Sequence, residues 1–424
     1  MSQHTVLAGK RVVLGVTGSI AAYKAATLAS RLTQMGALVD VIMTEAATRF
    51  VTPLTFQSLT GRAVYASLWE NAHGGGGGPD DLGSHIAHVG LAERADLLLL
   101  APATANTIAK IALGLADDLL SVTALAARCP IIMAPAMDAG MYENPVTQAH
   151  VETLRVRGVH FAGPVVGRMA SGLEGMGRMV EPDEIIGHCR YVLGRNGPLH
   201  GRRVVVTAGP TREPLDPVRF ISNHSTGKQG FAIAQAAVDA GADVTLISGP
   251  VALSAPVGVH RVDVTDADSM RAAVLAHATR GNQADALIMS AAVADFRPLR
   301  ESDEKIKKAE ETKRRRPAPF TLELVQTPDI LLEVTQQVAR PRVTIGFAAE
   351  SEDLIENARA KLEQKRLDLI VANDITAEDA GFEADTNRVH FITAEGAEAL
   401  PLMSKEEVGV RLVEWLVERL AEER

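Results

Sequence analysis

The stretch TAGPTREPLDPVRFISNHSTGKQG, residues 207–230, decides how the second half of this chain folds. It follows an apolar run, Arg202–Val206, that predicts a buried strand, and a helical pattern begins near Phe231. Connections between a strand and a helix in a parallel sheet usually have about two to six residues. This one is several times longer and is rich in Gly, Pro and hydrogen-bonding side chains. A loop of this kind at the carboxyl end of a strand indicates a ligand site.

Outward from this loop, apolar runs and helical patterns alternate to the end of the sequence. The expected strands are 202–207, 243–248, 286–290, 343–348 and 367–371. The expected helices are 230–240, 269–279, 328–338, 351–364 and 405–422. This alternation is typical of a parallel sheet covered by helices.

The first half of the sequence has the same pattern. The expected strands are 11–16, 37–43, 96–101 and 130–134, and the expected helices are 20–35, 104–113, 117–127 and 145–157. Near 185–198 the alternation loosens, and Asn, Gly and Pro at 196–198 mark a joint. We therefore predict an α/β protein with two Rossmann-like doubly wound domains, 1–190 and 201–424, joined by a linker at 191–200.

Composition excludes several classes of protein. The chain has 424 residues, which suggests two domains, and 46% of them are hydrophobic but only 4% aromatic. A net charge of −9 argues against binding to nucleic acid. Two cysteines, Cys129 and Cys189, give no disulfide framework. No secretory leader and no apolar run of about 18 residues is seen, so we expect a cytoplasmic protein without a membrane partner.

Two stretches in the first half combine a strand end, a helix start and phosphate-binding groups. Gly18 and Ser19 open the first expected helix, where backbone N–H groups attract anions. In APATANTIAK, residues 101–110, the side chains of Thr104, Asn106 and Thr107 could reach a phosphate or a ring edge. The G-x-G-x-x-G fingerprint is absent, which disfavours NAD and favours a mononucleotide. A tight turn with a capping serine is the alternative for Gly18–Ser19.

Three further segments carry candidate chemistry. PAMDAGMYENP, residues 135–145, follows the fourth expected strand, and ASGLEGMGRM, residues 170–179, is expected to form a glycine-rich flap outside any regular element. His85 and His88 lie between a run of five glycines, 74–78, and the next strand. A histidine just ahead of a sheet edge is a candidate acid or base.

These segments, in this order, resemble the FMN-dependent cysteine decarboxylase family over residues 10–182. The resemblance implies that FMN oxidises a substrate thiol to a thioaldehyde, that CO2 then leaves, and that the reduced flavin returns the hydride. It assigns the base to His88, which stands in the family's H-[IV]-x-L-A pattern. It assigns flavin binding to residues of the first three strand ends: Gly18, Ser19, Thr44, Thr104, Ala105, Asn106 and Thr107.

The sequence departs from this family at two positions. Asp138 replaces an Asn that holds the substrate carboxylate, and two carboxylates repel unless one is protonated or a cation intervenes. Ser171 replaces the Cys that donates the last proton, and a hydroxyl is a far weaker acid than a thiol. Glu174 is the substitute acid that the flap offers.

The second half carries polar groups at the ends of successive strands. The loop 207–230 offers Gly209, Asn223 and Ser225, but it does not form a P-loop. MSAAVADFRP, residues 289–298, has small residues that let a flat base approach the backbone, followed by an acid that could hold Mg2+. EKIKK, residues 304–308, gathers three lysines that suit a triphosphate. As a strand it would place Lys305 and Lys307 on one face.

These segments resemble the phosphopantothenate–cysteine ligase family over residues 201–424. The resemblance implies an acyl-cytidylate made from CTP, which the cysteine amine then converts to an amide. It assigns Asn223 to the intermediate, Lys305 to the nucleotide step and Asp295 to Mg2+. It assigns nucleotide binding to residues at several strand ends: Gly209, Ser225, Ala294, Asp295, Phe296, Lys305, Lys308 and Phe347.

As a whole the sequence resembles the bacterial fusion enzymes that make 4′-phosphopantetheine in two consecutive steps of coenzyme A synthesis. The resemblance implies trimers of the first domain with FMN at subunit contacts and dimers of the second, which a dodecamer would satisfy. The small-molecule substrates would be 4′-phosphopantothenate, cysteine and CTP. Two alternatives stay open: an oxidoreductase that uses NAD and FMN, and a ligase whose first domain binds flavin only as a scaffold or regulator.

Overall fold

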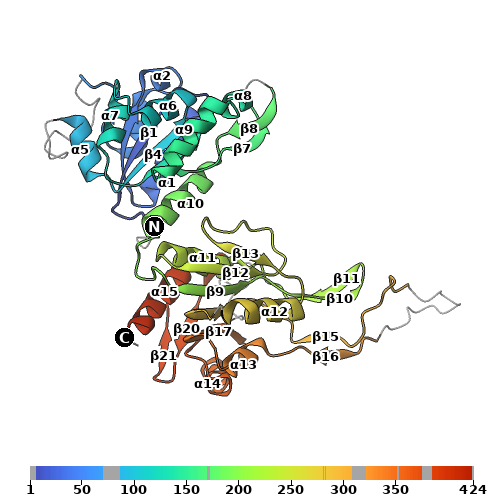
Figure 1. The fold of residues 1–424 in the computed structure, drawn as a ribbon. Coiled ribbons are helices and arrows are strands. Elements are labelled where there is room, and N and C mark those ends of the chain that lie inside the picture. The colour runs from blue at the N-terminus through green and yellow to red at the C-terminus, as the bar shows by residue number, and fades with distance from the viewer. Residues whose placement is uncertain are drawn as a thin grey trace. The chain divides into compact units, whose positions relative to one another are not determined.

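The computed structural model describes residues 6–69, 86–169, 172–279, 281, 283–307, 321–350, 353–374 and 384–422. The chain divides into two compact units, Met1–Gly194 and Arg195–Arg424, drawn in blue to green and in green to red in Figure 1. Both units are α/β layers, as the alternating pattern predicts. Each unit is described by itself below.

The first unit is built on a six-stranded parallel sheet in the order β3-β2-β1-β4-β5-β6. Its strands are β1 (Arg11–Val16), β2 (Leu38–Met43), β3 (Val64–Tyr65), β4 (Leu97–Ala103), β5 (Ile131–Pro135) and β6 (His160–Phe161). This order is that of a doubly wound nucleotide-binding fold. The strand order reverses between β1 and β4, which opens a crevice at their carboxyl ends.

Helices cover both faces of this sheet. They are α1 (Ala22–Gln34), α2 (Glu45–Thr48), α3 (Pro53–Thr60), α5 (Ala87–Arg94), α6 (Ala105–Leu113), α7 (Leu119–Ala126), α8 (Ala139–Tyr142), α9 (Pro145–Val156) and α10 (Pro182–Gly194). Side chains alternate across a strand, so Leu97 and Leu99 enter one hydrophobic cluster while Leu98 and Leu100 enter the other. Burial on both faces explains why β4 has an unbroken apolar sequence.

The second unit repeats the strand order and adds an antiparallel edge. Its eight-stranded sheet has the order β13-β12-β9-β14-β17-β18-β20-β21, and the pairings are parallel as far as β18. The strands are β9 (Arg203–Ala208), β12 (Asp243–Ser248), β13 (His260–Asp263), β14 (Ala286–Met289), β17 (Val343–Glu350), β18 (Leu369–Asp374), β20 (Val389–Ile392) and β21 (Ala397–Ala399). The strands β20 and β21 pair antiparallel. The reversal of order between β9 and β14 again opens a crevice.

The helices of the second unit are α11 (Lys228–Asp239), α12 (Ala267–Ala278), α13 (Ile330–Thr335), α14 (Leu354–Lys365) and α15 (Lys405–Glu422). Gly230 lets α11 lie close to β9, because a Cβ there would stand 2.7 Å from Ser290 Oγ and 2.9 Å from Thr207 O. In doubly wound folds such a glycine brings the helix N-terminus close to the strand end where a ligand binds.

Four antiparallel strand pairs complete the two units. They are β7 (Val165–Arg168) with β8 (Glu174–Arg178), β10 (Arg212–Asp216) with β11 (Arg219–Ser222), β15 (Phe296–Pro298) with β16 (Leu324–Gln326), and β19 (Thr386–Asn387) with β22 (Met403–Ser404). The structure contradicts the expectation that 170–179 lies outside regular structure, because β8 occupies five of these ten residues. Hairpin β10–β11 lies inside the long loop 207–230, and α11 begins at Lys228, earlier than expected.

Two other expectations need adjustment. The interval 191–200 overlaps the last turn of α10, which continues to Gly194. Residues 304–307 of the lysine segment form no strand, and Lys308 lies outside the described residues. Both large sheets end in short strands: β3 and β6 have two residues each, β13 has four and β21 has three. In the part of the chain that the structure describes, no helix has the length and apolar character needed to cross a membrane.

Candidate active sites

The first unit has a cavity of about 1000 Å³ at the carboxyl ends of β1, β2, β4 and β5. Its wall contains the seven predicted flavin-binding residues and Asp138, together with two arginines of hairpin β7–β8. The residues that the argument uses are Thr17, Gly18, Ser19, Lys24, Thr44, Thr104, Ala105, Asn106, Thr107, Lys110, Asp117, Asp118, Asp138, Arg168 and Arg178. The fold therefore brings together side chains that lie up to about 160 residues apart in the sequence. They meet at the edge of the sheet where doubly wound folds bind ligands.

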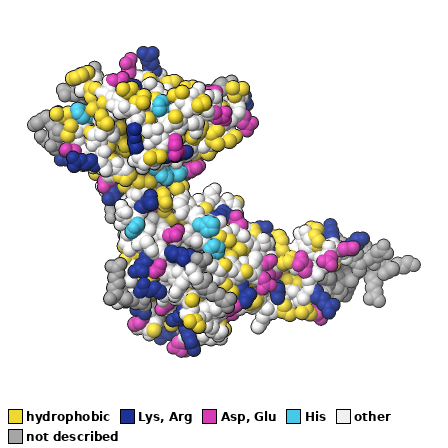
Figure 2. Space-filling view, in the orientation of Figure 1, with side chains coloured by type: hydrophobic (Ala, Val, Ile, Leu, Met, Phe, Trp, Pro, Cys, Tyr) yellow, Lys and Arg dark blue, Asp and Glu magenta, His cyan; other side chains and the backbone are white. Residues whose placement is uncertain are grey.

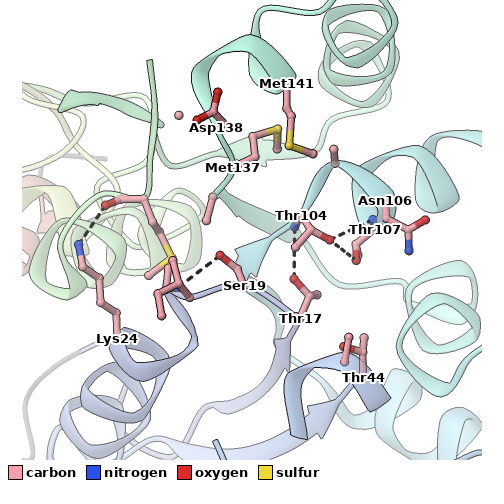
Figure 3. Close-up of a pocket in the computed structure, with 18 of the residues that line it drawn as sticks. Thr17, Ser19, Lys24, Thr44, Thr104, Asn106, Thr107, Met137, Asp138 and Met141 are labelled. Atoms are coloured by element: carbon pink, nitrogen blue, oxygen red, sulfur yellow. Dashed lines mark hydrogen bonds between the residues drawn. The ribbon is translucent and has the colours of Figure 1, made fainter. Parts of the chain in front are cut away.

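Two threonines join the loops that follow β1 and β4. Thr17 is fully buried, its hydroxyl donates to Pro102 O at 2.7 Å, and it accepts from the Thr104 backbone N–H at 3.2 Å. Thr104 is the N-cap of α6, and its hydroxyl lies 3.2 Å from that of Thr107 (Figure 3). These bonds orient the first turn of α6, whose free N–H groups and helix dipole favour an anion.

The loop after β1 adds a second set of backbone donors. Ser19 N–H donates to Thr17 O at 2.9 Å, and Ser19 Oγ accepts from Ala21 N–H at 3.3 Å. Thr44 begins α2 as its N-cap and accepts from Ala47 N–H at 3.3 Å. Ser19 is therefore not the capping residue of α1, whose N-cap is Ala21 without a side-chain cap, and its hydroxyl instead bonds within the turn before the helix, on the cavity wall.

Charged groups of both signs surround the cavity. Lys24 is buried, and its Nζ donates to Met179 O at 3.2 Å and to Glu181 at 2.9 Å, which ties α1 to the end of hairpin β7–β8 (Figure 3). Lys110 contacts Asp117 and Asp118 at 2.7 and 2.9 Å. The hydrogen bond to Asp117 is the main reason why the pKa of Lys110 is raised above its ordinary value.

Asp138 lies on the same wall as these cations. Its Oδ1 accepts from Gly140 N–H at 3.2 Å, so that it caps α8. Gly177 of β8 packs closely on this turn, and Met137 N–H donates to Gly177 O at 3.0 Å. The hairpin thereby brings Arg168 and Arg178 to the wall that carries Asp138. A carboxylate-binding site that contains a carboxylate needs such cations, although Arg178 is itself ion-paired with Glu181 at 2.6 Å.

Of the predicted catalytic residues of the first unit, His88 does not line this wall, and Ser171 cannot be placed. His88 lies on α5, whose Leu91 and Ala92 pack into the core, and His88 is absent from the cavity lining. Ser171 lies outside the described residues, as do His85 and the glycine run. Glu174 begins β8 and is exposed.

The second unit has a cavity of about 840 Å³ at the carboxyl ends of β14, β17 and β18 and beside the N-terminus of α11. Six of the predicted residues line it, with polar groups that the sequence analysis did not single out. The residues that the argument uses are Asn223, Ser225, Lys228, Ala294, Asp295, Phe296, Phe347, Lys361, Lys365, Asn373, Asn387 and Lys405. This is again the crevice at a reversal of strand order.

Hydrogen bonds fix the loop after β9 against the loop after β14. Asn223 Nδ2 donates to Ala292 O and Val293 O, both at 3.3 Å. The hydroxyl of Thr211, which is fully buried, accepts from Ala294 N–H at 3.0 Å. These bonds hold the loop after β9 against residues 292–294, the segment that is expected to contact the base of the nucleotide.

A buried lysine is the main residue that sequence reasoning missed. Lys405 is 6% exposed at the start of α15 and lies on the cavity wall with Lys228. Burial and the charge of Lys228 lower the pKa of Lys405, while Asp385, which contacts Lys228 at 2.6 Å, opposes this shift. The sequence alone shows only that Lys405 stands at the start of an expected helix with apolar residues around it.

Other predicted ligase residues lie off the wall. Gly209 has a φ of +75° and packs against Gly249 and Val251, so it forms the turn beside the cavity. Lys305 is exposed and does not line the cavity, and Lys308 lies outside the described residues. Within one chain, Lys305 therefore lies off the cavity wall that carries Asn223 and Asp295.

The carboxylate of Asp295 is the group on this wall that could hold a magnesium ion weakly. Among the described residues no group of three or more His, Cys, Asp or Glu gathers as a metal cluster. Asp295 lies on the cavity wall as a carboxylate donor. Mg2+ commonly takes one or two carboxylates and completes its shell with substrate phosphates and water.

Comparison with known proteins gives the class of each unit. Residues 1–193 match the Flavoprotein family model, and residues 199–420 match the model of the DNA/pantothenate metabolism flavoprotein C-terminal domain. The chain is thus a flavoprotein of the pantothenate-metabolism class, with both domains in one polypeptide.

More particularly, the chain belongs to the family of the coenzyme A biosynthesis bifunctional protein CoaBC. It is 45% identical over 414 residues to the Vibrio cholerae member, a match that covers 98% of this chain and 99% of that one. It is 45% identical over 413 residues to the Bacillus subtilis member, covering 96% of this chain and 97% of that one. It is 44% identical over 416 residues to the Escherichia coli K12 member, covering 98% of each.

Solved structures resemble each unit separately. The crystal structure of the C-terminal domain of CoaBC is 37% identical, with a TM-score of 0.44, and covers 54% of this chain and all of that one. A PPC decarboxylase mutant complexed with pantothenoylaminoethenethiol is 32% identical, with a TM-score of 0.37, and covers 43% of this chain and 97% of that one.

Proposed function

We propose that this chain catalyses two consecutive steps of coenzyme A biosynthesis. The first is the CTP-dependent ligation of 4′-phosphopantothenate with cysteine, and the second is the FMN-dependent decarboxylation of the product to 4′-phosphopantetheine. The observation that carries the proposal is the pair of cavities, each at the reversal of strand order in its own sheet and each lined by several of the residues that the resemblance assigns to its reaction.

In the ligase unit the anionic groups of the substrates would meet the N-terminus of α11 with Lys228 and Lys405. A bound anion stabilises the charged form of a buried lysine that lies near a second lysine. It replaces the hydration that the ammonium group lost on burial, and it offsets the repulsion between the two positive charges. Asp295 would hold Mg2+, which neutralises triphosphate oxygens. Asn223 would then orient the activated carboxyl group toward the cysteine amine, since it lies at the mouth of the same cavity.

Nucleotide choice would depend on the segment after β14. Ala291, Ala292 and Ala294 have small side chains, and their backbone lines the cavity beside Phe296. Ala294 N–H donates to Thr211 and Ala294 O accepts from Thr327, so the backbone of this segment is held in place and sets the space in which cytosine or adenine would have to fit.

In the decarboxylase unit the residues present fit FMN. The volume of about 1000 Å³ suits a large ligand, and the first turn of α6 with the Ser19 loop offers backbone donors for a phosphate. Bound FMN supplies the oxidation and re-reduction of the substrate. The chain's own residues position the reacting groups: Arg168 and Arg178 would offset the negative charge of Asp138 and of the substrate carboxylate.

We further propose that the active form is a homo-oligomer in which His88 completes the cavity of a neighbouring subunit. His88 is absent from its own cavity wall, and three large apolar side chains of that wall are more than half exposed: Ile20, Tyr23 and Met141. Figure 2 shows many hydrophobic side chains on the visible face of the first unit. Trimers of the first unit and dimers of the second would together form a dodecamer.

Mass spectrometry tests the proposed reactions. The protein is incubated with phosphopantothenate, cysteine, Mg2+ and either CTP or ATP. We expect phosphopantetheine with CTP. Product that stops at the amide would instead favour a ligase with a scaffolding flavin domain, and absence of the amide would contradict the ligase assignment.

Subunit mixing tests the shared site. Asn106→Ala alters the cavity wall and His88→Asn alters α5, so each variant alone should lose decarboxylation. Mixed oligomers contain cavities in which an intact wall meets an intact His88. Recovery of CO2 release on mixing is expected, and no recovery would place His88 and Asn106 in the same subunit's site.

A further inference from the structure

Hairpin β10–β11 is closed by one buried carboxylate. The side chain of Asp216 has no exposed surface, and its Oδ1 accepts from Val218 N–H and Arg219 N–H, both at 2.9 Å. Its Oδ2 accepts from the Arg219 guanidinium, through Nε at 3.0 Å and through Nη2. A carboxylate with this many donors is held in one orientation.

The same carboxylate reaches the lysine segment, which is about 90 residues away in sequence. Ile306 N–H donates to Asp216 Oδ2 at 3.1 Å, and Ile306 O accepts from Arg219 Nη2 at 3.0 Å. A third bond, from Ser302 N–H to Leu215 O at 3.1 Å, runs beside them. The backbone on both sides of Lys305 is therefore fastened to the hairpin.

The side chains in this tether differ sharply in exposure. Asp216 is buried and Ile306 is half-buried, whereas Lys305 and Lys307 are exposed. An exposed four-carbon lysine in a segment without regular structure has many conformations, and ordering it costs side-chain entropy. A backbone fixed in advance removes part of the cost of ordering this segment when the nucleotide binds.

We propose that Asp216 is a positioning residue for the nucleotide step, which it serves by holding the backbone of Ile306 and thereby placing Lys305. This inference rests on the proposed function, in which Lys305 serves that step. The Arg219 guanidinium holds the pKa of Asp216 well below its usual range, so the tether stays charged at any neutral assay pH.

Asp216→Asn tests the tether with little change in shape. An Asn keeps one oxygen for the two backbone N–H groups of the turn, but it presents an NH2 group to Ile306 N–H and Arg219. The matched control is Asp263→Asn, which makes the same change at an ion-paired and largely exposed carboxylate of the same unit. Thermal unfolding and size-exclusion chromatography check that the full-length variants are folded.

Tryptic cleavage after Lys305 reports the tether directly. We expect Asp216→Asn to be cut there about tenfold faster than the unmodified chain, as measured by mass spectrometry of the released peptides, with no change for Asp263→Asn. Equal cleavage rates in the unmodified chain and in Asp216→Asn would overturn the tether.

Partial reactions then separate positioning from general damage. In an Asn223→Asp background, where the acyl cytidylate should accumulate, Asp216→Asn is expected to slow its formation about tenfold to hundredfold. Cysteine capture of acyl cytidylate supplied to the Asp216→Asn single variant should change less than twofold. Faster cleavage with normal formation of the intermediate would overturn the positioning role. If the unmodified chain forms no intermediate from CTP, the proposed function fails, while the cleavage result still decides whether the tether exists.

Discussion

At the residue scale, the hydroxyl of Thr17 shows how one buried polar atom shapes a cavity. It donates to Pro102 O and accepts from Thr104 N–H, so this residue after β1 satisfies two backbone groups at the end of the neighbouring strand β4. A buried polar group left without a partner costs about 1–3 kcal/mol. The loops after β1 and β4 are therefore held together before any ligand binds.

His88 is the residue whose removal should separate the two reactions. We expect His88→Asn to lower CO2 release by about 10²–10⁴-fold while amide formation stays normal, because general bases contribute rate factors of this size. Amide and CO2 are measured in the same incubation. The control is His150→Asn, on α9, which should leave both rates unchanged.

Two results would contradict this assignment. Normal CO2 release from His88→Asn would remove His88 from the reaction. Equal loss of both activities would indicate damage to the fold, which the thermal unfolding of the variant would reveal.

Asn223→Asp should stop the ligase between its two half-reactions. The Asn223 amide donates to two carbonyl oxygens, and a carboxylate in its place would face them without a donor. We expect amide formation to fall at least about 100-fold, as a misplaced group typically causes. Accumulated acyl cytidylate, detected by mass spectrometry, is the measurement, and normal turnover with cysteine would refute the role.

The sequence was sufficient to predict the cavity residues that stand in local motifs. It was not sufficient to predict those that the fold brings in from distant parts of the chain. Ser19, Thr104 and Asn106 stand beside strand ends, so their place on the cavity wall follows from local pattern. Lys405 reaches its cavity from the last helix, about 180 residues after Asn223, and no local pattern encodes that contact. His88 and Lys305 were candidates by position and residue type, the resemblance assigned their roles, and neither lies on its own cavity wall.

At the scale of elements, a histidine pair joins the edge strand β6 to helix α10. His160 Nε2 and His188 Nδ1 lie 2.7 Å apart, which requires at least one unprotonated nitrogen in the contact. Burial, and to a smaller degree the charge of His160, lowers the pKa of His188 from 6.5 to about 4. The folded first unit therefore favours the neutral ring.

The sign of the resulting pH dependence follows from proton binding. Between about pH 6.5 and 4 the unfolded chain holds more protons at this site than the folded chain. The unfolding free energy of the first unit should thus fall by roughly 1–3 kcal/mol as the pH drops through this window. Urea unfolding at several pH values, followed by flavin release, measures it.

The matched comparison is His188→Gln, which has no titrating ring at this position. Its stability should vary less with pH across the same window than that of the unmodified chain. Identical pH profiles for the two proteins would assign the effect to other groups.

Buried strands were predictable and short polar hairpins were not. The residues 11–16 and 243–248 form β1 and β12 with the expected bounds, because a run of apolar residues buried on both faces is an unmistakable pattern. Hairpin β7–β8 contains glycines and exposed arginines, and strand β8 is held by contacts with Met137 and α8. Propensity alone favours a loop there.

For the whole molecule, separate cores predict separate folding. The hydrophobic clusters of the first unit contain only residues below 195, and those of the second only residues above it. We expect the polypeptides 1–194 and 195–424 each to unfold cooperatively, with the second still forming the amide. Calorimetry and pyrophosphate release are the measurements, and an unfolded second piece would contradict independence.

The short border strands of both sheets restrict how copies of this chain can associate. A long, flat border strand offers a row of free backbone groups that another chain can extend. Here β3, β6, β13 and β21 offer only two to four residues each, and β21 carries the exposed Glu398. Sheet continuation between copies is thus a poor route both to ordered assemblies and to fibrils. An assembly of this protein would have to form through side-chain surfaces, so its subunit contacts should be open to redesign by point substitution without disturbing either sheet.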